Sequence, residues 1–141
     1  MTPLQALQQT LAGEHAALYV YGVLGARVPA SAHPSLATRL VSAYTTHRAR
    51  RDHLSGLVRA AGGRPVAAEV SYRVPNAART VDELDTAALV IERRCASVYA
   101  AAVGSTSGAD RGWAVDALTD CAVRQLSFGG SPSSFPGAGE L

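Results

Sequence analysis

Apolar residues recur at alternating spacings of three and four positions in four separate stretches of the chain. The first stretch carries the repeat Leu4, Leu7, Leu11, Glu14, Leu18 and Tyr21. This spacing places the side chains in one stripe along a single face of an α-helix. The pattern therefore predicts four amphipathic helices that pack around a shared core through these stripes.

Capping and helix-breaking residues mark the ends of the first two helices. The first is expected to begin at Pro3 and to stop at Gly25 and Pro29. The second is expected to begin at Pro34 and to end at Gly62. Proline suits the first helical turn, where its missing N–H costs nothing, and glycine commonly follows the last turn.

The last two helices also have clear start signals. Thr80 and Glu83 form a capping-box pattern, so the third helix is expected to start at Thr80 and to end before Gly104. Asp110 is the candidate N-cap of the fourth helix, which is expected to end before Gly129. Residues 1–128 are thus predicted to form the helical bundle, and residues 129–141 a C-terminal tail.

A long segment without helical or strand periodicity separates the second and third helices. Residues 64–79 hold two prolines and several polar side chains. The segment is longer than the about two to eight residues that usually join bundle helices, so it can carry the chain to the far end of the bundle. We therefore expect an all-α four-helix bundle of ferritin-like layout, with two helical hairpins joined by one long crossover.

Composition places the chain among globular domains with a single core. Its 141 residues are 48% hydrophobic and 17% charged. No apolar run approaches the roughly 20 residues of a membrane span, and the first residues lack the features of a signal peptide. The net charge of +2 comes from scattered basic residues, which does not favour a nucleic-acid or membrane partner. We therefore expect a cytoplasmic protein.

Polar residues interrupt or border the apolar stripes near the middle of three helices. Glu14 and His47 occupy stripe positions in the first and second helices, and Glu92 borders the stripe of the third. A buried carboxylate costs several kcal/mol unless it is paired. The predicted central polar cluster consists of Glu14, His47, Arg51 and Glu92. Arg50 is the alternative arginine partner of Glu14, and tyrosines are expected to complete the hydrogen bonds.

A metal site is the first alternative for this polar centre. Its ligands would be Glu14, His47, Glu92 and Asp120, a set that suits iron or manganese. Di-metal bundles use a glutamate from each of two helices and a Glu-x-x-His pair from each of the other two. This chain lacks both pairs, so we expect no cofactor and no catalysis. A degenerate metal-binding protein or oxidoreductase stays as the alternative.

A binding module for a small ligand is the second alternative. The ligand would lie between the helices beneath the crossover, near Tyr21, Tyr44 and Tyr72. The motifs of serine hydrolases, phosphate-binding loops and dinucleotide-binding folds are missing from the sequence. Cys95 and Cys121 lack the spacing of a metal motif or a disulfide framework, so we interpret them as buried free thiols.

Several stretches resemble the DUF4439 family, a group of ferritin-like proteins found mainly in actinobacteria. The resemblance is carried by residues 11–22, 47–52, 72–75 and 135–137, together with Glu92. It spans nearly the whole chain and implies a ferritin-like four-helix fold. It also implies self-association, which we expect to give a homodimer, and descent from a superfamily that often binds two metals. No activity is assigned to the family.

Overall fold

The computed structural model describes residues 1–140, which form four α-helices and one short 3₁₀ helix and contain no strand. The elements are α1 (Pro3–Arg27), α2 (Pro34–Ala60), α3 (Val81–Ser105), α4 (Gly108–Ser127) and η1 (Ala138–Glu140). The all-α prediction is confirmed. Within this described part, none of the helices combines the length and the hydrophobicity that a membrane crossing needs.

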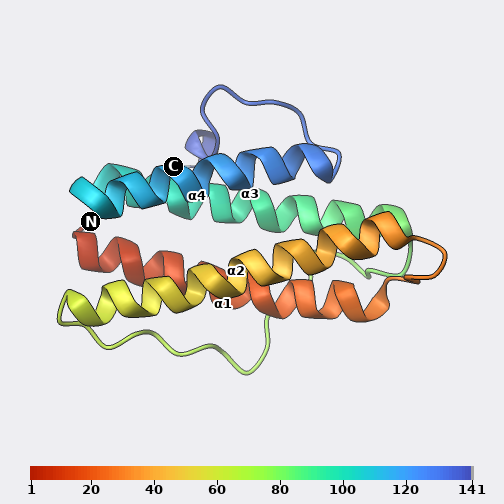
Figure 1. Ribbon diagram of the computed structural model, residues 1–141, viewed down its shortest axis with the longest axis horizontal. Coiled ribbons are helices and arrows are strands. Elements are labelled where there is room, and N and C mark those ends of the chain that lie inside the picture. Colours follow the sequence, from red (N-terminus) through yellow and green to blue (C-terminus); the bar gives the residue numbers. More distant parts are fainter. Residues whose placement is uncertain (141) are drawn as a thin grey trace.

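The helices pair into two antiparallel hairpins, α1 with α2 and α3 with α4 (Figure 1). Helix α1 also packs against α3, which joins the two hairpins into one bundle. Residues 61–80 run from the end of α2 to the opposite end of the bundle, where α3 begins (Figure 1). This arrangement confirms the predicted four-helix bundle of two hairpins and one long crossover.

Local capping explains where α1 and α3 begin. The Thr2 hydroxyl accepts a hydrogen bond from the Gln5 N–H, and the Gln5 side chain accepts one from the Thr2 N–H. Thr80 and Glu83 make the same reciprocal pair at α3, as the sequence predicts. Each pair satisfies two backbone N–H groups that the start of a helix would otherwise leave without a partner.

The start of α4 differs from the prediction. The helix begins at Gly108 with Ser107 at the N-cap, so Asp110 lies inside the first turn and does not cap the helix. Gly108 has a φ of +56°, a left-handed conformation that glycine adopts without steric cost. This glycine lets α4 start directly after α3. In the first turn, the Asp110 carboxylate still interacts favourably with the positive end of the helix dipole.

The core is apolar toward both ends of the bundle and polar in the middle. A small apolar cluster consists of Leu7, Leu11, Leu54 and Val58. A larger cluster contains the buried apolar residues of α3 and α4 together with those of the second half of α1 and the first half of α2. Between them lie Glu14, His47 and Glu92, each at most 1% exposed. The bundle therefore buries ionisable groups at the level where all four helices pass.

Side chains of α1 hold the crossover against the bundle. The Gln8 side chain donates a hydrogen bond to the Arg64 carbonyl oxygen at 2.7 Å and accepts one from the Val66 N–H at 2.9 Å. At the other end, Arg27 donates to the Ala77 carbonyl oxygen at 2.8 Å. The crossover is therefore fixed to α1 at both of its ends and forms a wall along that helix.

The C-terminal tail turns back and reaches α3 through η1 (Figure 1). Gly137 approaches α3 so closely that a Cβ atom there would overlap the Ala96 carbonyl oxygen. Its φ of +76° also favours glycine. Phe135, in contrast, is 78% exposed. The tail therefore contacts the bundle through the close approach of its backbone at Gly137, and the phenylalanine ring stays outside.

Candidate functional site

His47 lies at the centre of the buried polar layer. Its Nδ1 atom is 2.6 Å from Glu14 Oε2, and its Nε2 atom is 3.1 Å from Glu92 Oε1. A carboxylate oxygen accepts hydrogen bonds, so both ring nitrogens of His47 act as donors here. A histidine that donates from both nitrogens is an imidazolium cation. The ring therefore joins α2 to α1 and to α3 by charged hydrogen bonds.

The pKa of His47 reflects these neighbours. Burial by itself lowers the pKa, because it disfavours the charged ring. The negative charges of Glu14 and Glu92, and their hydrogen bonds to the ring, outweigh burial and raise the pKa from 6.5 to about 9. His47 is therefore positively charged at neutral pH.

Two tyrosines complete the hydrogen bonds of the carboxylates. The Tyr99 hydroxyl donates to Glu14 Oε1 at 2.5 Å, and the Tyr21 hydroxyl donates to Glu92 Oε1 at 2.6 Å. Burial and the adjacent glutamates raise the pKa of both tyrosines well above 10, so both remain neutral donors. The Tyr21 ring also stacks on His47, with ring centroids 5.3 Å apart. The result is a chain of hydrogen bonds with a tyrosine at each end and His47 in the middle.

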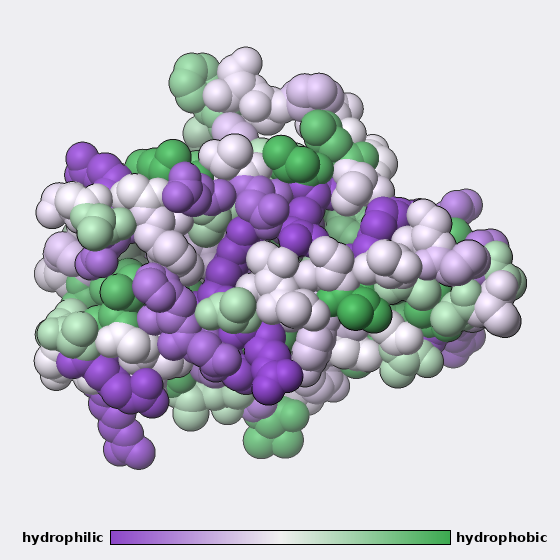
Figure 2. Space-filling model, viewed as in Figure 1, coloured by the Kyte–Doolittle hydropathy of each residue, from purple (hydrophilic) through white to green (hydrophobic). Residues whose placement is uncertain are grey.

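Arg50 continues the polar layer toward α4. It donates to Asp120 Oδ2 at 2.7 Å and to Cys121 Sγ at 3.4 Å. Asp120 also accepts from Arg124 at 2.8 Å, and Arg124 in turn donates to Thr46 on α2 at 2.7 Å. Figure 2 shows hydrophilic surface between α2 and α4 near the middle of the molecule. The Asp120 side chain is 39% exposed. The arginines therefore join the two hairpins across the bundle.

Arg50 and Arg124 determine the charge of Asp120. Burial alone would raise the pKa of Asp120, but the hydrogen bonds and charges of Arg124 and Arg50 hold it below its usual value. Asp120 therefore stays ionised at neutral pH. Across the whole layer, three carboxylates, those of Glu14, Glu92 and Asp120, face the three cations of His47, Arg50 and Arg124. The layer is balanced in charge.

Two buried thiols flank the carboxylates, as the sequence predicts. Cys95 and Cys121 are both free and buried. Burial raises the pKa of each thiol well above its usual value, so both stay neutral.

In the described residues, Cys95 forms the one close group of potential metal ligands with Glu14 and His47, whose ligand atoms lie within 4.8 Å of one another. Beside this group, the buried Glu92 Oε2 atom has no hydrogen-bond partner among residues 1–140.

The structure brings together three of the four residues predicted for the polar cluster. Glu14, His47 and Glu92 are in direct contact, but Arg51 is not among them. Arg51 pairs with its neighbour Asp52 at 2.7 Å, and its side chain is 32% exposed. Successive residues of a helix point about 100° apart, so only Arg50 faces the interior. The prediction of Arg51 is therefore wrong, and the partners of Glu14 are His47 and Tyr99.

The residues of the two alternative sites are placed differently from the expectation. Asp120 does not reach the Glu14–His47–Glu92 centre, because it is held by Arg50 and Arg124. Tyr21 belongs to the polar chain, and it also lines a pocket between α1 and α2 together with Tyr44, which is 39% exposed. Tyr72 lies on the crossover, against Tyr19 of α1. Tyr21 and Tyr44 therefore share one pocket, and Tyr72 lines a different one.

Replacing Arg50 with methionine is expected to lower the free energy of unfolding by about 1–3 kcal/mol, because it removes a largely buried cation between two helices. The same substitution at Arg51 is expected to change it by less than about 0.5 kcal/mol, since that ion pair is exposed. Urea denaturation followed by circular dichroism measures both values. Equal losses at the two positions would contradict the placement of Arg50 in the polar layer.

These contacts define a class of protein. It is an all-α four-helix bundle whose centre holds a buried hydrogen-bonded chain of tyrosine, glutamate and histidine side chains. A group of arginine and aspartate side chains lies beside this chain and balances its charge. The chain belongs to the DUF4439 family, described as a domain of unknown function, whose family model matches residues 6–140. The resemblance seen in the sequence is thereby confirmed.

A solved structure shares this fold. The chain is similar to the conserved hypothetical protein rv2844 from Mycobacterium tuberculosis, known from a crystal structure. The sequences are 30% identical, the match covers 90% of this chain and 94% of the other, and the TM-score is 0.83. No curated protein matches this chain.

Proposed function

We propose that this protein is a ferritin-like bundle that works without a metal and without catalysis, and that the imidazolium of His47 supplies the positive charge that its buried glutamates need. The observation that carries the proposal is the contact of both ring nitrogens with carboxylate oxygens, at 2.6 and 3.1 Å. Each carboxylate also accepts a tyrosine hydroxyl. The two glutamates thus have their charge partner within the protein.

The residues of the polar layer do not fit a di-metal centre. Such centres in four-helix bundles use four carboxylates and two histidines. The described residues place two glutamates and one histidine in the centre, and Asp120 is engaged by two arginines. A metal on His47 would also require the ring to lose a proton that it holds with a pKa of about 9.

A site for a single cation is the second candidate function. It is favoured by the close group of Glu14, His47 and Cys95 and by the buried Glu92 Oε2 atom without a partner in the described residues. Binding there would need the thiolate of Cys95 and neutral His47. The raised pKa values of both groups oppose these forms. The contacts therefore support the metal-free network better.

Metal analysis separates the two candidates. Protein expressed with iron, manganese and zinc supplied is expected to contain less than about one tenth of an equivalent of any of them, because no ligand lone pair of His47 is free. Elemental analysis of the purified protein gives this value, and the Glu14→Gln variant is the matched control. About one equivalent in the wild type, lost in the variant, would overturn the proposal.

Self-association as a homodimer stays part of the proposal. Support comes from apolar side chains on the outer face of α4 and on the tail, where Val115, Val123, Leu126 and Phe135 are between 42% and 78% exposed. Figure 2 shows hydrophobic surface along this edge of the molecule. An exposed patch of this kind is common where two protein surfaces meet.

A further inference from the structure

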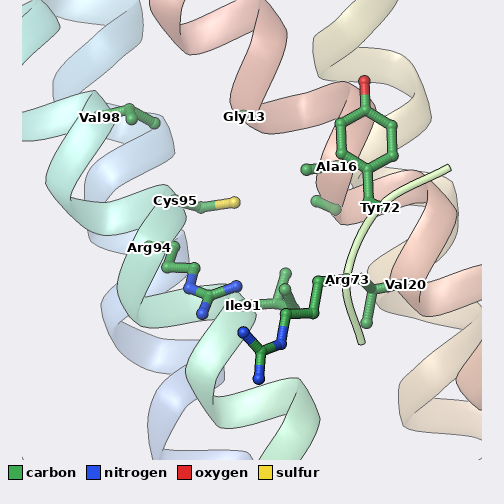
Figure 3. Close-up of a pocket in the computed structure, with 10 residues that line it drawn as sticks. Gly13, Ala16, Val20, Tyr72, Arg73, Ile91, Arg94, Cys95 and Val98 are labelled. Atoms are coloured by element: carbon green, nitrogen blue, oxygen red, sulfur yellow. The ribbon is translucent and has the colours of Figure 1, made fainter. Parts of the chain in front are cut away.

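A pocket lies between α1 and α3 on the side of the bundle that the crossover covers. Its volume is about 190 Å³. Gly13 and Ala16 of α1 face Ile91 and Val98 of α3 across it (Figure 3), and Ala17 of α1 also lines it. The small side chains of α1 leave the space open, and the wall is largely apolar. A cavity of about 150 Å³ is enough to bind a benzene ring in another protein, so a group of that size fits here.

The crossover forms a fixed third wall of this pocket. The Tyr72 ring packs on Tyr19 of α1, with centroids 5.7 Å apart. The Tyr72 hydroxyl accepts a hydrogen bond from the Glu69 N–H at 2.8 Å. Near the same place, His15 contacts the Val66 carbonyl oxygen at 3.0 Å. The pocket is therefore preformed, which lowers the entropy that a ligand has to overcome on binding.

Two arginines line the pocket beside its apolar wall. Arg73 belongs to the crossover and Arg94 to α3. Figure 3 shows their guanidinium groups turned toward each other near Ile91. Within residues 1–140, neither guanidinium forms an ion pair or a hydrogen bond. Both arginines are exposed, so solvent screens the repulsion between them, but an anion at the mouth of the pocket still accepts hydrogen bonds from both.

We propose that this pocket binds a small carboxylate that carries a short apolar chain. The chain lies between α1 and α3 against Ala16 and Val98, and the carboxylate accepts hydrogen bonds from Arg73 and Arg94. A guanidinium presents two parallel N–H groups to a carboxylate, which fixes the orientation of the ligand. Cys95 lines the inner end of the pocket, where its buried, neutral thiol contributes contact area and no charge.

Hexanoate is the probe for this proposal, followed in the ¹⁵N-labelled full chain by amide chemical shifts. Saturable shifts are expected at the amides of Gly13, Ala17 and Val98, with a Kd of about 1 mM or below. Hexylammonium has the same chain and the opposite charge, and acetate has the charge without the chain. Both are expected to bind more than about tenfold more weakly, because each lacks one of the two interactions.

Two pairs of variants test the two halves of the pocket. Ala16→Leu fills the apolar part and is expected to weaken hexanoate binding by about tenfold or more. Ala12→Leu, at an exposed position of α1 that does not line the pocket, is expected to leave binding unchanged. Arg73→Gln with Arg94→Gln is expected to weaken binding by about three- to tenfold. Arg93→Gln, at an exposed position outside the pocket, is the control.

Thermal unfolding shows whether each variant folds. If the Ala16→Leu variant does not fold, the double arginine variant alone tests the proposed site. The proposal is overturned if the pocket amides show no saturable shift up to about 10 mM hexanoate. It is also overturned if hexylammonium binds as well as hexanoate, or if binding survives in both the Ala16→Leu variant and the double arginine variant.

Discussion

Replacing His47 with leucine is expected to lower the free energy of unfolding by about 3–5 kcal/mol at neutral pH. The substitution leaves Glu14 and Glu92, which are at most 1% exposed, without their shared cation. Removing one partner of a buried ion pair is costly because the remaining charge is neither solvated nor paired. Urea denaturation at pH 7, followed by circular dichroism, measures the loss.

The control for this substitution is His53→Leu on the same helix. His53 is exposed and lies against Trp113, so its loss is expected to change stability by less than about 0.5 kcal/mol. Adding Glu14→Gln and Glu92→Gln to the His47→Leu variant is expected to recover part of the loss, because neutral amides cost less to bury than carboxylates. A loss below about 1 kcal/mol for His47→Leu would contradict the central role of the ring.

The free energy of unfolding is expected to fall by about 3 kcal/mol as the pH rises from about 6.5 to about 9. The folded protein holds the His47 proton with a pKa of about 9, against 6.5 in the unfolded chain. Between these values the folded state binds one proton more than the unfolded state, so stability falls by about 1.4 kcal/mol per pH unit. Below pH 6.5 the contribution of His47 is fully present. Denaturation midpoints at several pH values give the profile.

Two variants assign this profile to His47. His53→Leu is expected to keep the fall between pH 6.5 and 9, because the ring of His53 is exposed. Glu92→Gln is expected to move the fall to lower pH, since one of the two carboxylates that raise the pKa of His47 is then neutral. Above about pH 9 the buried tyrosines and thiols, whose pKa values are raised, add a further loss. A level profile from pH 6.5 to 9 would contradict a protonated His47.

Most of the fold follows from local signals. The reciprocal pair of Thr80 and Glu83 marked the start of α3, because capping depends on neighbours in the sequence. The length of the segment before it was enough to predict the crossover. The start of α4 was misplaced at Asp110, because the tight connection depends on the left-handed backbone of Gly108. Glycine permits this conformation without requiring it, so the sequence alone leaves the first residue of α4 open.

The polar centre was only partly predictable. Glu14, His47 and Glu92 stood out because each lies on or beside a stripe of apolar residues. The sequence does not distinguish Arg50 from Arg51 as the inward-facing arginine, because the two are neighbours and either one can continue the apolar stripe of the second helix. Only the position of α4, which carries Asp120, shows that Arg50 points inward. The sequence indicated a ligand site beneath the crossover near Tyr72, which lines the pocket beside Cys95. It did not indicate the α1 wall of that pocket, because small residues such as Gly13 and Ala16 carry no chemical signal in the sequence.

The sequence by itself determined an all-α bundle of two hairpins and the presence of buried carboxylates that need a positive partner. The spacing of apolar residues can be read along the sequence, and the cost of burying a charge is the same kind of cost in any protein core. Neither depends on how the helices of this protein pack. Only the tertiary structure decided that this partner is the His47 ring, bonded at both nitrogens. Contacts of 2.6 to 3.1 Å depend on the relative positions of three helices, which the packing of the whole core sets.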